Sequence, residues 1–285
     1  MNNIKKNQII DNSFKYFGVF STFIGLAVLA VFIVYIIYEG ANRINWSFLT
    51  NMPSRLPLKA GILPAWTGTV WIFVLTSLIS IPLGLGAGLY LEEYTKKSKL
   101  ADFLEINIAN LAGVPSIIYG ILSLEIFVRL MNLGGSLLAG SLTLSLLILP
   151  VIIVATREAI RAVPKTMREA SYALGATKWQ TIWNQVLPAS MNSIYTGIIL
   201  ALSRAIGETA PLIVIGALAY VPFTPKSPMD EFTVLPMQIF NWVSRPQKGF
   251  IINAAAAILI LLLIVFILNG VAIYFRNKAQ KKINW

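Results

Sequence analysis

The 285-residue chain contains no cysteine and no histidine, and only 12% of its residues are charged. Without cysteine there is no disulfide, no thiol nucleophile and no thiolate metal ligand. Without histidine there is no imidazole to bind a metal or transfer protons near neutral pH. These absences exclude most enzyme chemistry, and they predict a protein with no catalytic residues, no metal site and no cofactor.

Hydrophobic residues, by contrast, make up 56% of the chain, and its mean hydropathy is +0.72. An ordinary soluble domain is roughly 45–50% apolar and about 25% charged. A domain of this length has too little interior to bury such an excess of apolar surface, so lipid must solvate part of it. The composition therefore predicts a membrane protein in contact with membrane lipid.

Six segments are apolar and long enough, or nearly so, to cross a bilayer, which takes about 20 residues. The predicted spans are Phe17–Tyr38, Trp66–Leu91, Glu105–Met131, Leu137–Thr156, Ala189–Val221 and Phe250–Phe275. We expect an all-α polytopic protein with six transmembrane helices in one membrane domain over residues 17–275, with short tails at 1–16 and 276–285. No internal repeat or separate soluble domain is evident in the sequence.

The net charge of +11 comes from 23 Lys and Arg residues against 12 Asp and Glu residues. If the loops alternate between the two sides of the membrane, one side carries fifteen of these cations and the other carries seven, with Arg204 left inside the fifth span. The positive-inside rule then places the richer side, and with it both termini, in the cytoplasm of a cell-membrane protein. This distribution explains the basic charge without a nucleic-acid partner.

The longest predicted cytoplasmic segment, residues 157–188, is patterned as two short amphipathic helices. Apolar positions follow Pro164 at helical spacing until Gly175, a typical helix stop. Thr177 and Gln180 then form a capping box that begins a second helix, which runs up to Pro188. The pair fits either a lipid headgroup layer or a protein partner. Its polar face carries both basic and acidic side chains, which fits a protein partner at least as well as a lipid surface.

This segment resembles the EAA loop of ABC-importer permeases at five positions, namely Glu169, Ala170, Gly175, Leu187 and Pro188. It departs at two others, where Ser171 replaces the second alanine and Gln185 stands where isoleucine is usual. The resemblance implies a coupling-helix pair that docks into a cleft on a separate ATPase subunit. The chain itself contains no GxxxxGK[ST] phosphate loop, so ATP hydrolysis is expected in a partner.

Arg204 and Glu208, four residues apart, are the charged residues inside the predicted fifth span. An arginine at mid-membrane costs about 2.5–3.5 kcal/mol on insertion scales, so it needs a partner or a purpose. One interpretation is a structural ion pair. The other is a substrate pathway in which Arg204 binds an oxyanion and Glu208 accepts a hydrogen bond from the proton of hydrogen phosphate, a proton that sulfate lacks. Arg157, at the cytoplasmic end of the fourth span, is either a weaker pathway candidate or a positive-inside anchor.

The string SRAIGETAP, residues 203–211, resembles the fifth span of phosphate-importer permeases, specifically of their A subunit. PLGLGAGLYLEEY at 82–94 and NLAGVPSIIYG at 110–120 are similar to the same family. The resemblance implies three kinds of partner protein and no nucleic acid: a second permease subunit of the C type, two ATP-binding cassette ATPase subunits and an extracytoplasmic phosphate-binding protein.

The sequence thus predicts a permease subunit of an ATP-driven importer of inorganic phosphate. Three alternatives stay open at this point. The same machine can serve another oxyanion such as sulfate, molybdate or tungstate, because charge alone does not separate these ions. An ion-coupled secondary transporter working alone also suits an Arg and Glu pair within a span. A non-transporting membrane scaffold is the third.

Overall fold

A computed structural model describes residues 2–95, 98–218 and 220–280. This part of the chain is helical, with one isolated β-bridge between Ser136 and Glu231. Its elements in chain order are α1 (Asn2–Gly40), η1 (Ala41–Arg43), α2 (Trp46–Thr50), α3 (Leu63–Leu89), η2 (Tyr90–Tyr94), α4 (Lys99–Leu111), α5 (Ser116–Ser123), η3 (Leu124–Leu130), α6 (Leu137–Arg161), α7 (Lys165–Ala173), α8 (Lys178–Thr181), η4 (Ile182–Val186), α9 (Leu187–Gly207), α10 (Ala210–Val214), α11 (Leu235–Val243) and α12 (Lys248–Gln280). Element η1 is a 3₁₀ helix, while η2, η3 and η4 are π-helical turns.

The all-α membrane architecture is confirmed. Within the described ranges, five helical stretches are long and apolar enough to cross a membrane, and the number is six if a bent pair of helices is one broken span. The five stretches are Ile10–Arg43, Leu63–Tyr94, Leu137–Arg161, Lys178–Gly207 and Lys248–Lys278. Each overlaps a span predicted from hydropathy.

The predicted third span, Glu105–Met131, is not one straight helix. Helix α4 ends at Leu111, and the chain turns by 103° before α5 and η3 continue to Leu130. Pro115 explains the break, because it has no N–H to donate into a helix and disfavours helical backbone in the residue before it. The apolar run predicted the crossing and could not predict its bend.

The predicted fifth span, Ala189–Val221, also needs correction at both ends. Its helix runs without interruption from Lys178 through η4 into α9, so Pro188 does not mark a start. The π-helical turn η4 ends at Val186, two residues before Pro188, which has no N–H to donate within the helix. At the other end α9 stops at Gly207, and Glu208 has extended backbone, with φ −75° and ψ 123°.

Helix α6 is the central helix of the bundle and packs between α3 and α9. Ser136 begins it by accepting a hydrogen bond from the N–H of Ala139. Glycines of α3 allow the close approach: a Cβ at Gly84 would lie 2.5 Å from the Ile152 side chain, and one at Gly88 would lie 2.7 Å from Thr156. The α3–α6 contact therefore depends on small residues, as is usual between membrane helices.

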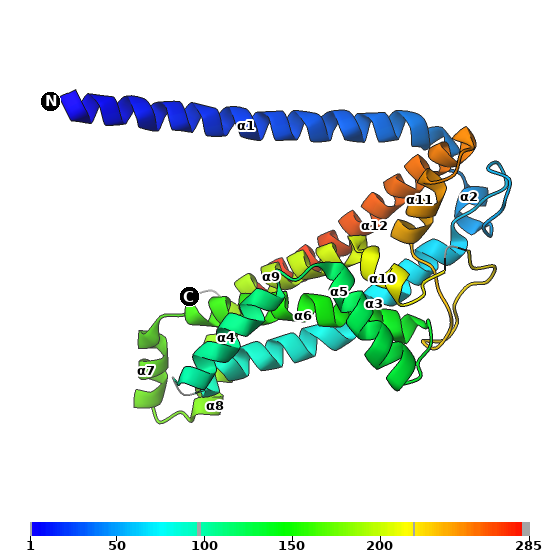
Figure 1. The fold of residues 1–285 in the computed structure, drawn as a ribbon. Coiled ribbons are helices and arrows are strands. Elements are labelled where there is room, and N and C mark those ends of the chain that lie inside the picture. The colour runs from blue at the N-terminus through cyan, green and yellow to red at the C-terminus, as the bar shows by residue number, and fades with distance from the viewer. Residues whose placement is uncertain (1, 96–97, 219, 281–285) are drawn as a thin grey trace.

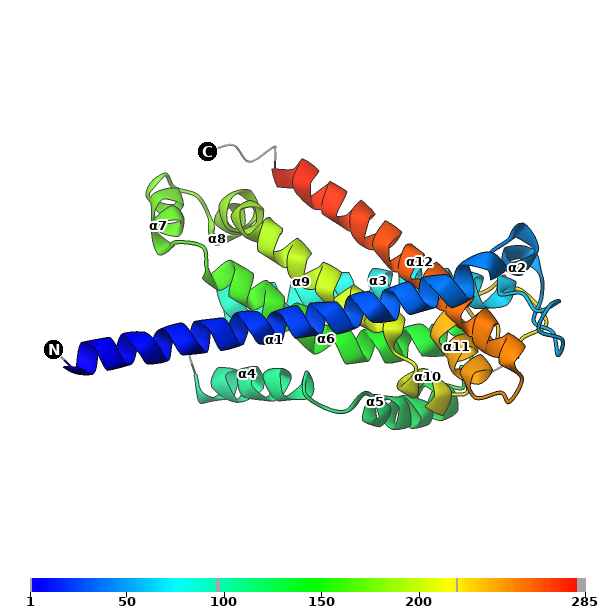
Figure 2. The same ribbon diagram turned by 90° about the horizontal axis from the view of Figure 1, so that it is seen from above.

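Helix α1 diverges from the bundle as a long arm (Figures 1 and 2). Near its end Gly40 packs against the backbone of Ala255 and Ala256 in α12. Along most of its length its large apolar side chains are exposed. The helix begins at Asn2, so the predicted tail over residues 1–16 is helical from that residue onward.

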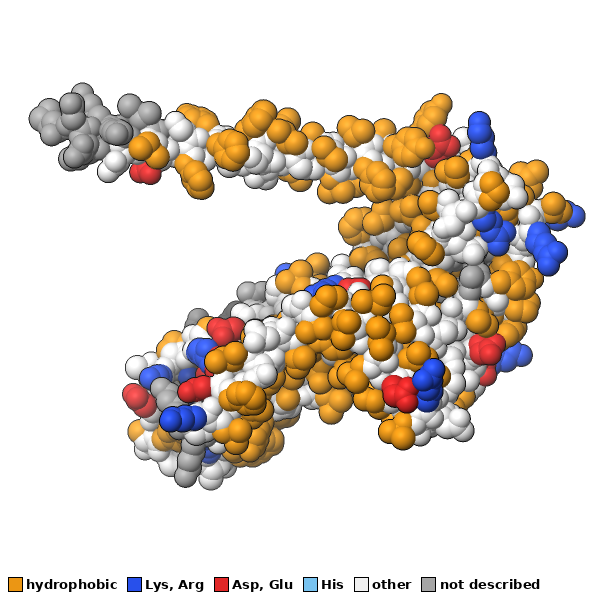
Figure 3. Space-filling view, viewed as in Figure 1, with side chains coloured by type: hydrophobic (Ala, Val, Ile, Leu, Met, Phe, Trp, Pro, Cys, Tyr) orange, Lys and Arg blue, Asp and Glu red, His pale blue; other side chains and the backbone are white. Residues whose placement is uncertain are grey.

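Charge and hydrophobicity are separated along the molecule. Figure 3 shows hydrophobic side chains over the middle of the bundle, with most charged side chains gathered at its two ends. The start of α1 and the end of α12 lie toward the end that carries α7 and α8 (Figures 1 and 2). This apolar band between two charged ends matches the hydrocarbon core between two interfaces.

Candidate functional site

Helices α7 and α8 protrude as a compact pair at one end of the bundle. Gly175 ends the first helix with a φ of +82°, a conformation that suits glycine. The capping box predicted for the second helix is present: the Thr177 side chain accepts from the N–H of Gln180, and the Gln180 side chain accepts from the N–H of Thr177. Both local predictions are confirmed.

The five EAA-like positions do not gather at one place. Glu169, Ala170 and Gly175 are exposed on the protruding pair, whereas Leu187 and Pro188 are half-buried where α9 begins. An open groove of about 680 Å³ runs along the pair. Its lining consists of Met167, Ala170, Ser171, Leu174, Gly175, Ala176, Gln180, Asn184 and Gln185. Leu174 at its rim is 90% exposed, so this end of the molecule presents an exposed apolar side chain beside the groove.

A network of ion pairs fastens α3, α4 and α6 together beside this groove. Arg157 donates to Glu105 at 2.9 Å and to Glu92 at 3.4 Å, and Arg161 donates to Glu105 at 3.3 Å and to Glu92 at 3.0 Å. Arg157 is only 8% exposed. Two carboxylates therefore neutralise the residue that the sequence suggested as a weaker pathway candidate.

Sequence reasoning missed Glu92, Glu93 and Glu105 as partners in this region. The adjacent carboxylates of the LEEY string at the end of a long apolar run were an available signal. Such residues are expensive near a membrane unless they are paired. Which cations they pair with depends on helices more than 50 residues away, as in the 52-residue separation of Glu105 and Arg157.

Arg204 and Glu208 form an ion pair, with 3.3 Å between Arg204 Nε and Glu208 Oε1. Arg204 lies in the last turn of α9, and Glu208 follows the end of the helix. A cation in a last turn interacts favourably with the helix dipole, which adds a local reason for Arg204. The Arg204 side chain is 46% exposed, and that of Glu208 is 19% exposed.

Helix α9 has two contrasting faces at this end. One face carries Ala201, Leu202, Ala205 and Ile206, which are buried against the bundle. The other carries an exposed stripe at helical spacing, made of Ser193, Thr196, Leu200, Arg204 and Gly207. Arg204 thus belongs to the open face of the helix and not to the core.

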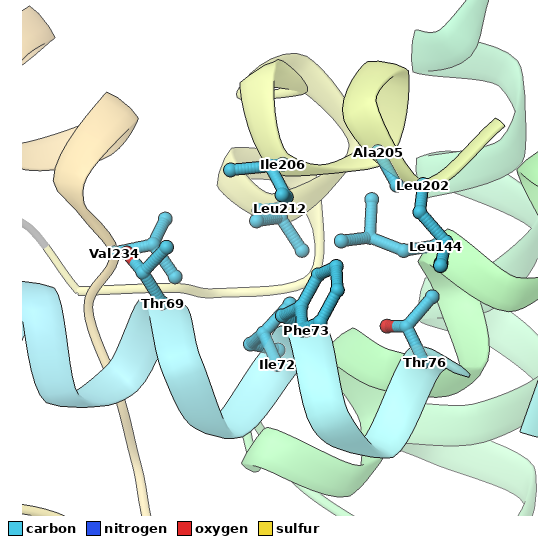
Figure 4. Close-up of a pocket in the computed structure, with 10 residues that line it drawn as sticks. All are labelled: Thr69, Ile72, Phe73, Thr76, Leu144, Leu202, Ala205, Ile206, Leu212 and Val234. Carbon is cyan, nitrogen blue, oxygen red and sulfur yellow. The ribbon is translucent and has the colours of Figure 1, made fainter. Parts of the chain in front are cut away.

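A small cavity lies on the buried side, between α3, α6, α9 and the chain around α10 and α11 (Figure 4). Its lining is apolar apart from Thr69 and Thr76, and its volume of about 10 Å³ would hold at most about one water molecule. No charged side chain lines it. It is a packing void, and an oxyanion has neither room nor a counter-charge there.

The segment that ends NLAGVPSIIYG, residues 110–120, meets the segment that ends SRAIGETAP, residues 203–211. A Cβ at Gly120 in α5 would lie 2.8 Å from the Cα of Pro211 in α10, so these short helices pack backbone to backbone. The phenol of neighbouring Tyr119 donates to the carbonyl of Leu111 at 2.7 Å. The break in the third span therefore lies next to the break after α9.

This fold defines the class: a polytopic helical membrane protein with an exposed helix pair at one end. The likeness to solved structures agrees. The MetNI methionine ABC transporter in an inward facing conformation matches with a TM-score of 0.59, at 17% identity over 74% of this chain and 93% of that one. A bacterial ABC transporter involved in the import of the acidic polysaccharide alginate matches with a TM-score of 0.59, at 14% identity over 92% of this chain and 96% of that one.

The chain belongs to the family of binding-protein-dependent transport system inner membrane components, which it matches over residues 80–280. Among relatives, the probable ABC transporter permease protein YqgI of Bacillus subtilis is 34% identical over 86% of this chain and 87% of that protein. The phosphate transport system permease protein PstA of Xylella fastidiosa is 30% identical over 96% of each. The phosphate transport system permease protein PstA 1 of Mycobacterium tuberculosis is 33% identical over 78% of this chain and 72% of that protein.

Family membership makes this chain a multi-pass inner-membrane permease subunit, not an enzyme in its own right. Such an importer implies a partner permease, ATPase subunits and a substrate-binding protein. Membership of this family therefore disfavours both the solitary ion-coupled transporter and the non-transporting scaffold.

Proposed function

We propose that this chain is the A-type permease subunit of an ATP-driven importer of inorganic phosphate. The observation that carries the proposal is the Arg204–Glu208 pair on the open face of α9, in a chain whose relatives include phosphate permeases over most of its length. Sulfate, molybdate or tungstate is the alternative cargo. No contact in the described chain favours those anions over phosphate.

In the proposed pathway Arg204 supplies a fixed cation with several N–H donors, which suits the oxygens of a phosphate. Glu208 accepts a hydrogen bond from the proton that hydrogen phosphate carries, and it repels a fully ionised oxyanion. The exposed stripe of α9 would then face the partner permease across the pathway. Arg157 is a weaker candidate for phosphate release, because Glu92 and Glu105 already hold it.

We assign coupling to the protruding pair. Glu169, Ala170 and Gly175 lie on the exposed part that an ATPase subunit would contact, and Leu187 and Pro188 lie within the helix that leads into the membrane. Because helix Lys178–Gly207 is continuous, a push on α8 moves α9 as one body and reaches Arg204. In the assembly we propose two ATPase subunits, a C-type permease and an extracytoplasmic phosphate-binding protein.

The proposed orientation puts α7, α8 and both termini in the cytoplasm, around a membrane domain over residues 17–275. It is supported by the fifteen cations on one set of loops. The placement of the start of α1 and the end of α12 toward the α7–α8 end agrees with it.

Uptake of labelled phosphate into vesicles tests the proposal. We expect ATP-dependent uptake when the chain is reconstituted with its ATPase subunits, a second permease and the binding protein. Omission of the ATPase should abolish uptake. Phosphate uptake that persists without any ATPase would overturn the importer assignment.

Glu208→Gln tests the proposed discrimination between phosphate and sulfate. The amide removes the negative charge that repels sulfate, so we expect sulfate to compete with phosphate about tenfold better, an effect worth about 1.4 kcal/mol. The measurement is labelled phosphate uptake at rising sulfate concentration, with Glu125→Gln in the exposed Glu125–Arg129 pair as the matched control. Unchanged uptake and unchanged discrimination would assign Arg204 and Glu208 to a structural ion pair.

A further inference from the structure

Glu93, in the π-helical turn that continues α3, is the point where both protruding helices attach to the bundle. Its carboxylate oxygen Oε1 accepts from Arg168 of α7 twice, at 3.0 Å from Nε and 2.7 Å from Nη2. Its backbone carbonyl accepts from the ammonium of Lys178 in α8. The Glu93 side chain is only 8% exposed, so this is a largely desolvated ion pair and not a surface contact.

Each of the two cations has a second anchor. Arg168 also donates to the carbonyl of Val163 at 2.7 Å and to that of Ile160 at 3.0 Å, just where α6 ends. The Ile160 carbonyl also accepts from the N–H of Val163 at 3.2 Å. Carbonyls at the end of a helix carry the negative end of its dipole, so a guanidinium suits them. Lys178 lies 4.8 Å from the centre of the Tyr94 ring. The protruding pair is thus fastened to the ends of both α3 and α6.

The adjacent carboxylate, Glu92, points to different partners. It pairs with Arg157 and Arg161 of α6 and so holds α3 to the neighbouring helix inside the bundle. Two consecutive residues of one turn therefore have separate tasks. Glu92 fixes α3 to α6, and Glu93 fixes α3 to the α7–α8 pair.

We propose that Glu93 is a positioning residue that transmits movement of the α7–α8 pair to α3, alongside the continuous helix that transmits it to α9. This inference rests on the proposed docking of an ATPase on that pair. If the pair were joined to the bundle solely through the chain, its movement would act directly on α6 and α9. The Glu93–Arg168 bond adds α3, which lies against α6 and α9 in the core.

The ratio of phosphate taken up to ATP hydrolysed, measured in the same vesicles with the complete complex, tests this role. In Glu93→Gln and Arg168→Gln we expect the complex to assemble and hydrolyse ATP, while the ratio falls about tenfold, because one partner of a desolvated pair has lost its counter-charge. A purely structural staple would not change this ratio in an assembled complex.

Glu125→Gln is the matched control, since Glu125 and Arg129 also form an ion pair, at 2.9 Å, but with both side chains about two-thirds exposed. Its ratio should equal that of the wild type. An unchanged ratio in Glu93→Gln and Arg168→Gln would overturn the proposal, and so would equal loss of uptake and hydrolysis, which would indicate docking alone.

If Glu93→Gln fails to assemble, Arg168→Lys decides the matter. It keeps the charge and loses the two-nitrogen contact, so a lowered ratio supports transmission and an unchanged ratio overturns it. Failure of the underlying function is distinguishable, because wild-type vesicles would then show no ATP-dependent phosphate uptake at all.

Discussion

At the residue scale, three glycines spaced two apart in α3 have different surroundings. Gly84 and Gly88 lie against α6, whereas a Cβ at Gly86 would have no neighbour within 4 Å. Only two of the three glycines therefore serve helix packing. The difference arises because a helix turns by 100° per residue, so alternate residues cannot all face one neighbour.

Gly88→Leu should therefore destabilise the protein, by about 1–3 kcal/mol, since the new side chain would overlap Thr156 in a packed interface. Thermal unfolding in detergent measures the effect. Gly86→Leu is the matched control in the same helix and should change stability by no more than about 0.5 kcal/mol. Equal effects of the two substitutions would contradict the α3–α6 packing.

Arg43 organises the loop at the opposite end of the bundle. Its guanidinium donates to the Asn253 side chain at 2.8 Å and contacts three backbone carbonyls, those of Pro57, Leu58 and Ala60. Arg43→Ala should lower stability by about 1–3 kcal/mol, because these acceptors lose their donor. Thermal unfolding measures this loss of stability, with Arg55→Ala at an exposed position as the control. Equal unfolding midpoints for the two variants would show that the hydrogen bonds of Arg43 contribute nothing to stability.

At the scale of elements, the turn between α7 and α8 depends on backbone conformation and not on space. Gly175 has a φ of +82°, and a Cβ there would meet nothing within 4 Å. Gly175→Ala should still destabilise this turn by about 1–2 kcal/mol, because an L-residue is strained at a positive φ. We expect weaker co-purification of the ATPase subunit with Gly175→Ala than with Gly175→Asn, since asparagine tolerates this conformation better. Equal co-purification would refute a conformational role for Gly175.

The broken helices show what hydropathy cannot give. Apolar runs located the third and fifth spans, because burial in lipid depends on composition over a window. The 103° turn after Leu111 and the end of α9 at Gly207 depend on which neighbouring elements receive the chain. Gly120 and Pro211 meet in the two short helices that follow these breaks, and they are 91 residues apart, so no local pattern predicts their contact.

At the scale of the whole molecule, the absence of native cysteine allows a clean test of orientation. Leu58 is 87% exposed in the loop before α3, and Asn277 is exposed near the end of α12. In cells stripped of their wall, an impermeant maleimide should label Leu58→Cys at once and Asn277→Cys only after permeabilisation. The opposite order would invert the topology derived from the positive-inside rule.

Sequence alone determined the properties that arise within a few residues or from composition: membrane residence, the approximate spans, the Gly175 stop and the capping box of Thr177 and Gln180. Only the tertiary structure decided which charges meet. Glu93 and Arg168 are 75 residues apart, and Arg157 gained carboxylate partners from two other elements. The physical reason is that periodicity and caps are short-range effects, whereas an ion pair depends on which helix faces pack together.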